Sequence, residues 1–149
     1  MRQCQIRGLP NGYDGSQNTA FTCTELNGET IANPLAKFNG KENTATLVGL
    51  GSNFMAAYAC DHYSTSLTNE HDWFLPSVGE LAYIMPRFNK INTAIQKAGG
   101  IPLDTNDSYW SSSEYSLDSA YYVGTGNGLV GYGGKDYYYY VRPFVSPAF

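Results

Sequence analysis

The chain has 149 residues, a formal net charge of −4 and a sequence pI near 5.0, and 15% of its residues are charged. A chain of this length suits one domain that buries enough apolar surface to fold unaided. Its 9 Lys and Arg residues are spread along the sequence, which argues against binding to a phosphate backbone and so against a nucleic-acid partner.

The sequence also lacks the apolar segments that membranes require. No apolar run approaches the ~20 residues that span a bilayer, and the start, MRQCQIRGLPNG, has no apolar core of a secretion signal. We therefore expect a soluble chain without membrane insertion.

The first predicted elements are short. Residues 1 to about 43 are rich in Gly, Asn and Thr and predict one or two short strands joined by turns. The stretch SNFMAAYACDHYS then predicts a short, largely buried helix, with Ser52 as the N-cap and an end near His62.

A stronger helix signal follows in WFLPSVGELAYIM. Ser77 and Glu80 have the S-x-x-E spacing of a capping box, and apolar residues from Leu81 to Phe88 recur on one helical face. Pro86 is expected to end or kink this helix. NKINTAIQKAGG predicts a second helical stretch that stops at the glycine pair 99–100.

From Ile101 onward the pattern changes to short strands separated by glycine turns. SYWSSSEYS, SAYYVGTGNG, LVGYGGKD and YYYYVRPFV predict such strands, and GNG is typical of a hairpin tip. The whole order, short strands, then two main helices, then a meander, predicts an α+β domain with antiparallel pairing over residues 1–149.

Tyrosine and glycine are concentrated in this last third. Of the 13 tyrosines, nine lie between Tyr109 and Tyr140, among closely spaced glycines. In a strand, Tyr137 and Tyr139 would share one face and Tyr138 and Tyr140 the other. Packing in a core would explain the tyrosines alone, whereas a binding face explains both residue types, because rigid rings supply contact area and small residues give access.

Two groups of residues invite a metal-site or catalytic hypothesis. His62 and His71 lie near acidic residues, but a solvated loop is the favoured interpretation because they lack the i, i+4 spacing of H-E-x-x-H. Cys4, Cys23 and Cys60 match no zinc pattern and permit at most one disulfide, whose formation the sequence leaves open. We expect neither a metal nor another cofactor.

Other catalytic motifs are also weak. The serines of residues 111–113 lack a G-x-S-x-G elbow, and GTGNG lacks the following helix and Lys-Ser or Lys-Thr pair of a phosphate loop. An enzyme therefore stays an alternative only, which a deep pocket with convergent polar groups would support.

Several motifs together resemble a known family. DWFLPSVGELAYI, followed by YWSSSEYS, AYYV and YVRPF, is similar to the C-terminal domain of bacterial collagen-like adhesins, and the similarity covers about residues 39–144. This resemblance implies the C-type lectin fold. Many members of the family, in gut bacteria and their phages, are variable proteins of diversity-generating retroelements.

In those systems an error-prone reverse transcriptase converts asparagine codons of a template repeat into NNC codons. The fixed positions of the template would be Tyr109, Trp110, Ser111, Ser112, Ser113, Glu114, Tyr115, Ser116, Ala120, Val123, Gly128, Val130, Lys135, Val141, Arg142 and Pro143. The diversified ones, called the variable positions below, would be Leu117, Asp118, Ser119, Tyr122, Gly124, Gly126, Asn127, Leu129, Gly131, Tyr132, Gly133, Gly134, Asp136, Tyr137, Tyr138 and Tyr139. NNC codons encode every residue type in this variable set.

The chain departs from the family pattern at Tyr121 and Thr125 and in its ending FVSPAF. It lacks the E-P-N, Q-P-D and W-N-D motifs of calcium-dependent lectins, and its cysteines precede the region where formylglycine-generating enzymes of this fold carry theirs. Scaffold roles are expected for Trp73, Leu75, Ser77, Glu80, Leu81, Trp110, Glu114 and Arg142, the last two as polar ties between strands.

The resemblance predicts a binding module without chemistry, either a receptor binder on a phage tail tip or an adhesin on a bacterial cell surface. Its ligand would be a macromolecule, protein or glycan, on a target cell. Several displayed copies are expected because one such face alone would bind weakly. A purely structural phage or pilus subunit is a third possibility, favoured if the tyrosines were buried between subunits.

Overall fold

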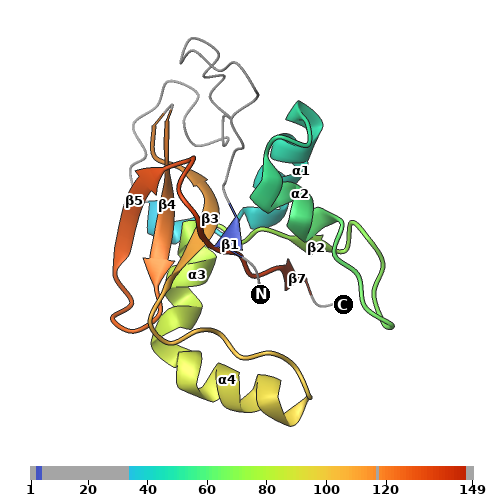
Figure 1. The fold of residues 1–149 in the computed structure, drawn as a ribbon, viewed down its shortest axis with the longest axis vertical. Coiled ribbons are helices and arrows are strands. Elements are labelled where there is room, and N and C mark those ends of the chain that lie inside the picture. The colour runs from blue at the N-terminus through green and yellow to red at the C-terminus, as the bar shows by residue number, and fades with distance from the viewer. Residues whose placement is uncertain (1–2, 5–33, 117, 147–149) are drawn as a thin grey trace.

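Seven short strands and four α-helices are formed by residues 3–4, 34–116 and 118–146, the part of the chain that the computed structural model describes. The fold is α+β, as the sequence predicts (Figure 1). The main sheet consists, in spatial order, of β1 (Gln3–Cys4), β6 (Tyr139–Tyr140), β3 (Ser108–Glu114), β4 (Ser119–Gly124) and β5 (Val130–Gly134). A second sheet pairs β2 (Trp73–Phe74) with β7 (Phe144–Val145).

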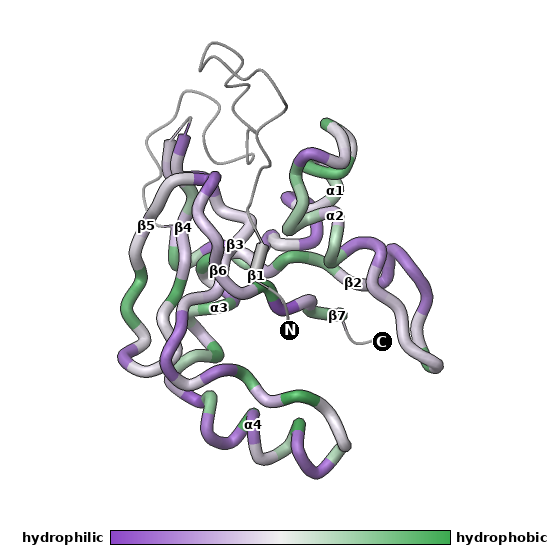
Figure 2. Tube along the Cα trace, viewed as in Figure 1, coloured by the Kyte–Doolittle hydropathy of each residue, from purple (hydrophilic) through white to green (hydrophobic). Residues whose placement is uncertain are grey.

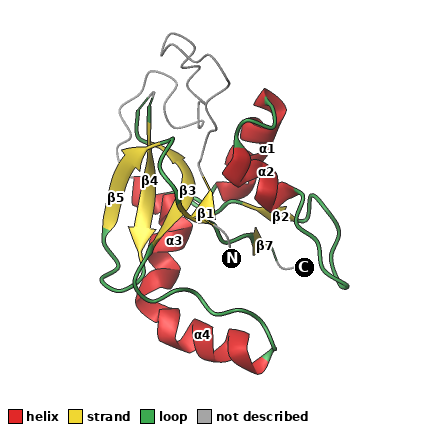
Figure 3. Cartoon of the chain, in the orientation of Figure 1, coloured by secondary structure: helices red, strands yellow, loops and turns green. Residues whose placement is uncertain are grey.

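The helices cover both faces of the main sheet. In chain order they are α1 (Gly40–Leu50), α2 (Met55–Asp61), α3 (Val78–Ile84) and α4 (Phe88–Lys97), with 3-10 turns at Pro34–Ala36 and Met85–Arg87. Figure 3 shows α1 and α2 on one side of the sheet and α3 behind it. α4 extends away from the sheet and is mostly hydrophilic (Figure 2).

The main sheet separates two hydrophobic cores, because successive side chains of a strand point to opposite faces. Trp110 and Ala120 pack in the core that α1 and α2 complete. Tyr109, which precedes Trp110 in β3, and Val123 of β4 pack in the other core, which includes Leu81 of α3. All five side chains are at most 1% exposed, so both faces of β3 and β4 are covered near the middle of the sheet.

Three consecutive serine hydroxyls bind β3 to three neighbouring elements. Ser111 Oγ donates to the carbonyl of Tyr121 in β4 at 2.8 Å. Ser112 Oγ accepts from Asn43 Nδ2 of α1 at 3.2 Å, and Ser113 Oγ accepts from the first backbone amide of α3 at 3.0 Å. Because these serines are fully buried, the hydroxyls act as structural ties in the centre of the fold.

The predicted capping box begins α3. Ser77 N donates to Glu80 Oε2 at 2.6 Å, and Glu80 N donates to Ser77 Oγ at 3.3 Å. Burial raises the pKa of Glu80, although the hydrogen bonds from Ser77 act in the opposite direction. Pro86 lies in the 3-10 turn that separates α3 from α4, and α4 stops before Gly99, whose φ of +75° is a left-handed conformation that suits glycine.

The structure corrects three expectations from the sequence. α1 is a helix in a region for which none was predicted, so the domain has more than two main helices. Ser52 is not an N-cap, because α2 begins at Met55 without a side-chain cap. β3 and β6 pair in parallel rather than antiparallel, at Tyr109 and Tyr140. The strands expected before residue 34 lie outside the described residues, apart from β1.

Candidate binding surface

The variable positions surround the hairpin of β4 and β5 and the turn that follows it. Leu117 lies outside the described residues. None of the other fifteen is buried, whereas ten of the sixteen fixed positions are. The buried fixed residues are Tyr109, Trp110, Ser111, Ser112, Ser113, Glu114, Ala120, Val123, Lys135 and Val141. Fixed and variable positions therefore differ in burial as well as in their expected codons.

Glycines of β5 make room for a tyrosine of β4. Tyr122 pairs with Gly131 across the hairpin, so both lie on the same face of the sheet. A Cβ atom at Gly131 would lie 2.6 Å from the Tyr122 ring, and one at Gly133 would lie 3.5 Å from it. The ring therefore covers β5 because position 131 carries glycine, whereas a Cβ at position 133 would meet the ring at an ordinary van der Waals distance.

The opposite face of the hairpin carries a second aromatic group. Tyr132 pairs with Tyr121 across the strands, and Tyr132 stacks on Tyr115 with ring centroids 3.7 Å apart. A hydrogen bond with the Tyr132 hydroxyl raises the pKa of Tyr115. Tyr115, a fixed position that was not predicted as a site residue, is 42% exposed and extends this aromatic face. Its place in the tyrosine-rich last third of the chain, at the end of a predicted strand, was the sequence signal that could have indicated this role.

The tyrosine run divides into exposed and half-buried residues. Tyr137 and Tyr138 are 58% and 59% exposed and precede β6. The expectation that all four tyrosines form one strand is therefore wrong, because the turn after β5 continues through Tyr137. The ring centroids of Tyr139 and Trp110 are 4.7 Å apart. Burial of the Tyr139 side chain, and to a lesser extent the neighbouring Tyr122, raises the pKa of Tyr139. Tyr140 stacks instead on Tyr109, in the other core.

A buried ion pair supports the turn that carries these tyrosines. Lys135 Nζ lies 2.6 Å from Glu114 Oε1, and both side chains are at most 3% exposed. Lys135 N also donates to the carbonyl of Asp118 at 2.8 Å. These contacts fasten the end of β5 to the end of β3. Arg142, the other predicted polar tie, donates from Nη2 to the carbonyl of Ile101 at 2.7 Å.

Two turns complete the surface. At the hairpin tip, Asn127 Oδ1 accepts from Leu129 N at 3.0 Å, and Gly128 has a φ of +64°. The tip borders a hollow of about 260 Å³ lined by Asn106, Asp107, Ser108, Gly124, Gly126 and Asn127. At the opposite end, Asp118 Oδ1 accepts from the hydroxyls of Ser116 and Ser119, and the first of these bonds lowers the pKa of Asp118.

The predicted scaffold residues lie outside this surface. Leu75, Ser77, Leu81 and Trp110 are fully buried. Trp73 is only half-buried, beside Tyr63 and with its indole N–H donating to Thr68, so it lies at the edge of the fold rather than in a core.

The sequence profile of the Lcl C-terminal domain family matches residues 16–145, which is most of the chain. The chain belongs to this family. The match includes every described strand except β1, and the whole described variable surface of the Lcl C-terminal domain. No curated protein matches the sequence.

A solved structure is similar to this Lcl C-terminal domain. It is a fimbrial protein from Bacteroides ovatus ATCC 8483, with 26% sequence identity and a TM-score of 0.61. The similarity covers 77% of this chain and 26% of the fimbrial protein, so the chain spans about a quarter of that protein's length.

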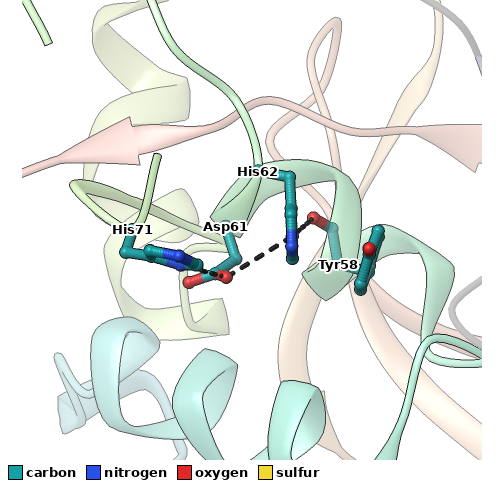
Figure 4. Close-up of polar contacts among 4 residues, drawn as sticks. All are labelled: Tyr58, Asp61, His62 and His71. Carbon is teal, nitrogen blue, oxygen red and sulfur yellow. Dashed lines mark hydrogen bonds and ion pairs between the residues drawn. The ribbon is translucent and has the colours of Figure 1, made fainter. Parts of the chain in front are cut away.

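The two histidines of the Lcl C-terminal domain lie beside one aspartate, Asp61 (Figure 4). His71 Nδ1 lies 2.6 Å from Asp61 Oδ2, while His62 Nδ1 lies 3.1 Å from the carbonyl of Tyr58 and 3.5 Å from the same carboxylate oxygen. Within residues 34–116 and 118–146, no three His, Cys, Asp or Glu side chains are grouped to hold a metal ion. Cys60 is buried in the core beside α1. None of the described helices is long and apolar enough to cross a membrane.

Proposed function

We propose that this Lcl C-terminal domain is a ligand-binding module whose Tyr and Gly surface is diversified by a retroelement. One observation carries the proposal: the fixed positions are mostly buried, and every described variable position has solvent access. Diversification requires this separation, because substitutions in a packed core cost far more than substitutions at the surface. Exposed tyrosines among glycines are the composition that paratopes use to bind varied ligands.

The proposal extends to the setting of the module. We infer a C-type-lectin-like fold acting as one domain over residues 1–149, displayed in several copies on a bacterial cell surface or a phage tail tip. The similarity to a fimbrial protein supports surface display. The ligand would be a macromolecule on a target cell, bound without catalysis.

The gene sequence tests the diversification directly. We expect a near-copy of codons 109–144 close to the gene, differing from it at adenines alone, beside a reverse transcriptase gene. The tyrosine and glycine codons at variable positions should end in C. Mixed third bases and the absence of such a repeat would contradict the retroelement, although not ligand binding.

The exposed tyrosines should carry the binding. Flow cytometry measures the binding of a streptavidin-mounted tetramer of the domain to a panel of intact bacteria. Replacement of Tyr132, Tyr137 and Tyr138 together by serine should abolish binding to the strains that the unmodified tetramer binds. Aromatic rings contribute most of the energy of such interfaces. The free energy of unfolding should change by less than about 1 kcal/mol, since the three side chains are more than half exposed.

A matched control uses exposed tyrosines outside the surface. Serine at Tyr58, Tyr63 and Tyr83, which are 39%, 44% and 57% exposed, should leave binding intact. Equal loss of binding in both triple variants would contradict a specific role for the variable positions. Assembly of the unmodified chain into polymers that bury its tyrosines would favour the structural subunit instead.

A further inference from the structure

β5 is an edge strand: it is the last strand in the order of the main sheet, and no described strand lies beyond it. Two backbone hydrogen bonds fix the pairing on its inner side. Gly124 N donates to Leu129 O at 2.9 Å, and Lys135 N donates to Asp118 O at 2.8 Å. In an antiparallel ladder these bonds alternate, so the odd-numbered residues from 129 to 135 direct their N–H and C=O groups toward β4.

The even-numbered residues of β5 direct their backbone groups outward. These residues are Val130, Tyr132 and Gly134, and the Gly134 carbonyl accepts from Tyr137 N at 2.9 Å. The sequence of β5, VGYGG, has no lysine, no proline and no other charged residue. Natural proteins commonly use such residues to protect an exposed edge from pairing. Among the described residues, neither a neighbouring strand nor the sequence of β5 itself blocks the pairing of a further strand with this edge.

The variable positions lie on both faces of this edge. The ring of Tyr122 covers Gly131 and Gly133 on one face. Tyr137 lies at the end of the strand, 3.5 Å from the Cβ position of Gly134. Tyr132 and Tyr115 occupy the other face. A ligand that contacts residues on both faces must pass over the edge itself, because β5 lies between them.

We propose that the ligand is a protein, one extended segment of which adds to the outer edge of β5 as a further strand. This inference rests on the proposed function and specifies its ligand class. An added strand would pair with the outward groups of Val130 and Tyr132, and its own alternating side chains would reach both aromatic faces. A sugar offers no matching row of N–H and C=O groups.

Strand addition also fits a surface whose side chains are diversified. Main-chain hydrogen bonds do not depend on side-chain identity, whereas the adjacent side chains determine which sequence fits. The backbone of β5 would thus supply a constant part of the affinity, and the variable positions would supply the specificity.

Proline at Val130 tests the pairing. Val130→Pro removes an outward amide and no hydrogen bond to β4, and proline is tolerated at the first residue of an edge strand. Val130→Ala is the matched control, because it shortens the side chain and keeps the amide. A random phage-displayed peptide library is the probe, selected on the unmodified domain, and circular dichroism checks that both variants fold.

We expect the selected peptides to bind Val130→Pro about tenfold more weakly than the unmodified domain, and Val130→Ala within about threefold. Bound peptide should also slow hydrogen exchange at the amides of Val130, Tyr132 and Gly134 in the unmodified domain, a measurement that does not require the proline variant to fold. Equal binding to both variants without slowed exchange, or no selected peptide at all, would overturn strand addition.

The same variants on the bacterial panel separate the two proposals. Binding to cells that is lost with serine at Tyr132, Tyr137 and Tyr138 but unaffected by Val130→Pro would retain the proposed function and overturn strand addition. Absence of any binding to cells, together with a missing template repeat, would count against the proposed function itself.

Discussion

Replacement of Lys135 by methionine is expected to lower the free energy of unfolding by about 3–5 kcal/mol. The change removes the cation that lies 2.6 Å from the carboxylate of Glu114, whose side chain is 2% exposed. A buried charge that loses its opposite charge costs much more than an exposed one. Urea denaturation followed by circular dichroism measures the loss.

The double variant Glu114→Leu/Lys135→Met distinguishes the ion pair from simple loss of packing. Since a buried pair can often be replaced by apolar side chains of similar volume, the double variant should recover most of the stability lost in Lys135→Met. Lys41→Met is the surface control, and it should change stability by less than about 0.5 kcal/mol because Lys41 is exposed. This account would be contradicted if the double variant lost as much stability as the two single variants, Glu114→Leu and Lys135→Met, lose together.

Trp110→Ala is expected to cost about 3–5 kcal/mol, because it leaves a large cavity in the core beside α1 and α2. It should also weaken ligand binding under conditions in which the variant stays folded. The Trp110 ring contacts Tyr139 at 4.7 Å and Tyr122 at 6.2 Å between centroids, so both variable tyrosines lose support. Denaturation curves give the first effect, and the bacterial panel gives the second.

Trp73→Ala provides the comparison for this experiment. Trp73 is half-buried and packs against Tyr63, away from the variable surface. Its replacement should cost less stability than that of Trp110 and leave binding unchanged. A smaller loss of binding for Trp110→Ala than for Trp73→Ala would mean that the core around Trp110 does not support the surface.

The sequence predicts best where the determinants of structure are local. Ser77 and Glu80 are three residues apart, and the capping box depends on little beyond this spacing. The hairpin tip and the glycine that follows α4 are likewise set by nearby residues with special backbone geometry. These features are present where they were predicted.

α1 could not be recognised from hydrophobic periodicity, because its buried face is partly polar. Asn43 and Thr44 are buried there, and their partners lie far away in the sequence: Asn43 donates to Ser112, and Thr44 Oγ1 accepts from Leu75 N at 2.9 Å. A helix that buries polar groups through tertiary hydrogen bonds gives no apolar stripe to detect.

The candidate surface was predictable in composition but not in geometry. The variable positions followed from a family pattern, whereas the arrangement of Tyr122 over Gly131 depends on the register between β4 and β5. Glu114 was singled out from the sequence, yet its partner Lys135 lies 21 residues away and was expected only as a fixed position. Long-range pairings of this kind emerge from the fold, not from any local pattern.

The three serine ties give β3 a different energetic status from β5. Ser111, Ser112 and Ser113 connect β3 to β4, α1 and α3, whereas β5 pairs with a described strand along one side only. Local opening therefore requires least free energy at the rim of the sheet and most at its centre. β5, which carries more of the proposed variable positions than any other described strand, is thus the strand that can adjust its shape to a ligand without loosening the rest of the fold.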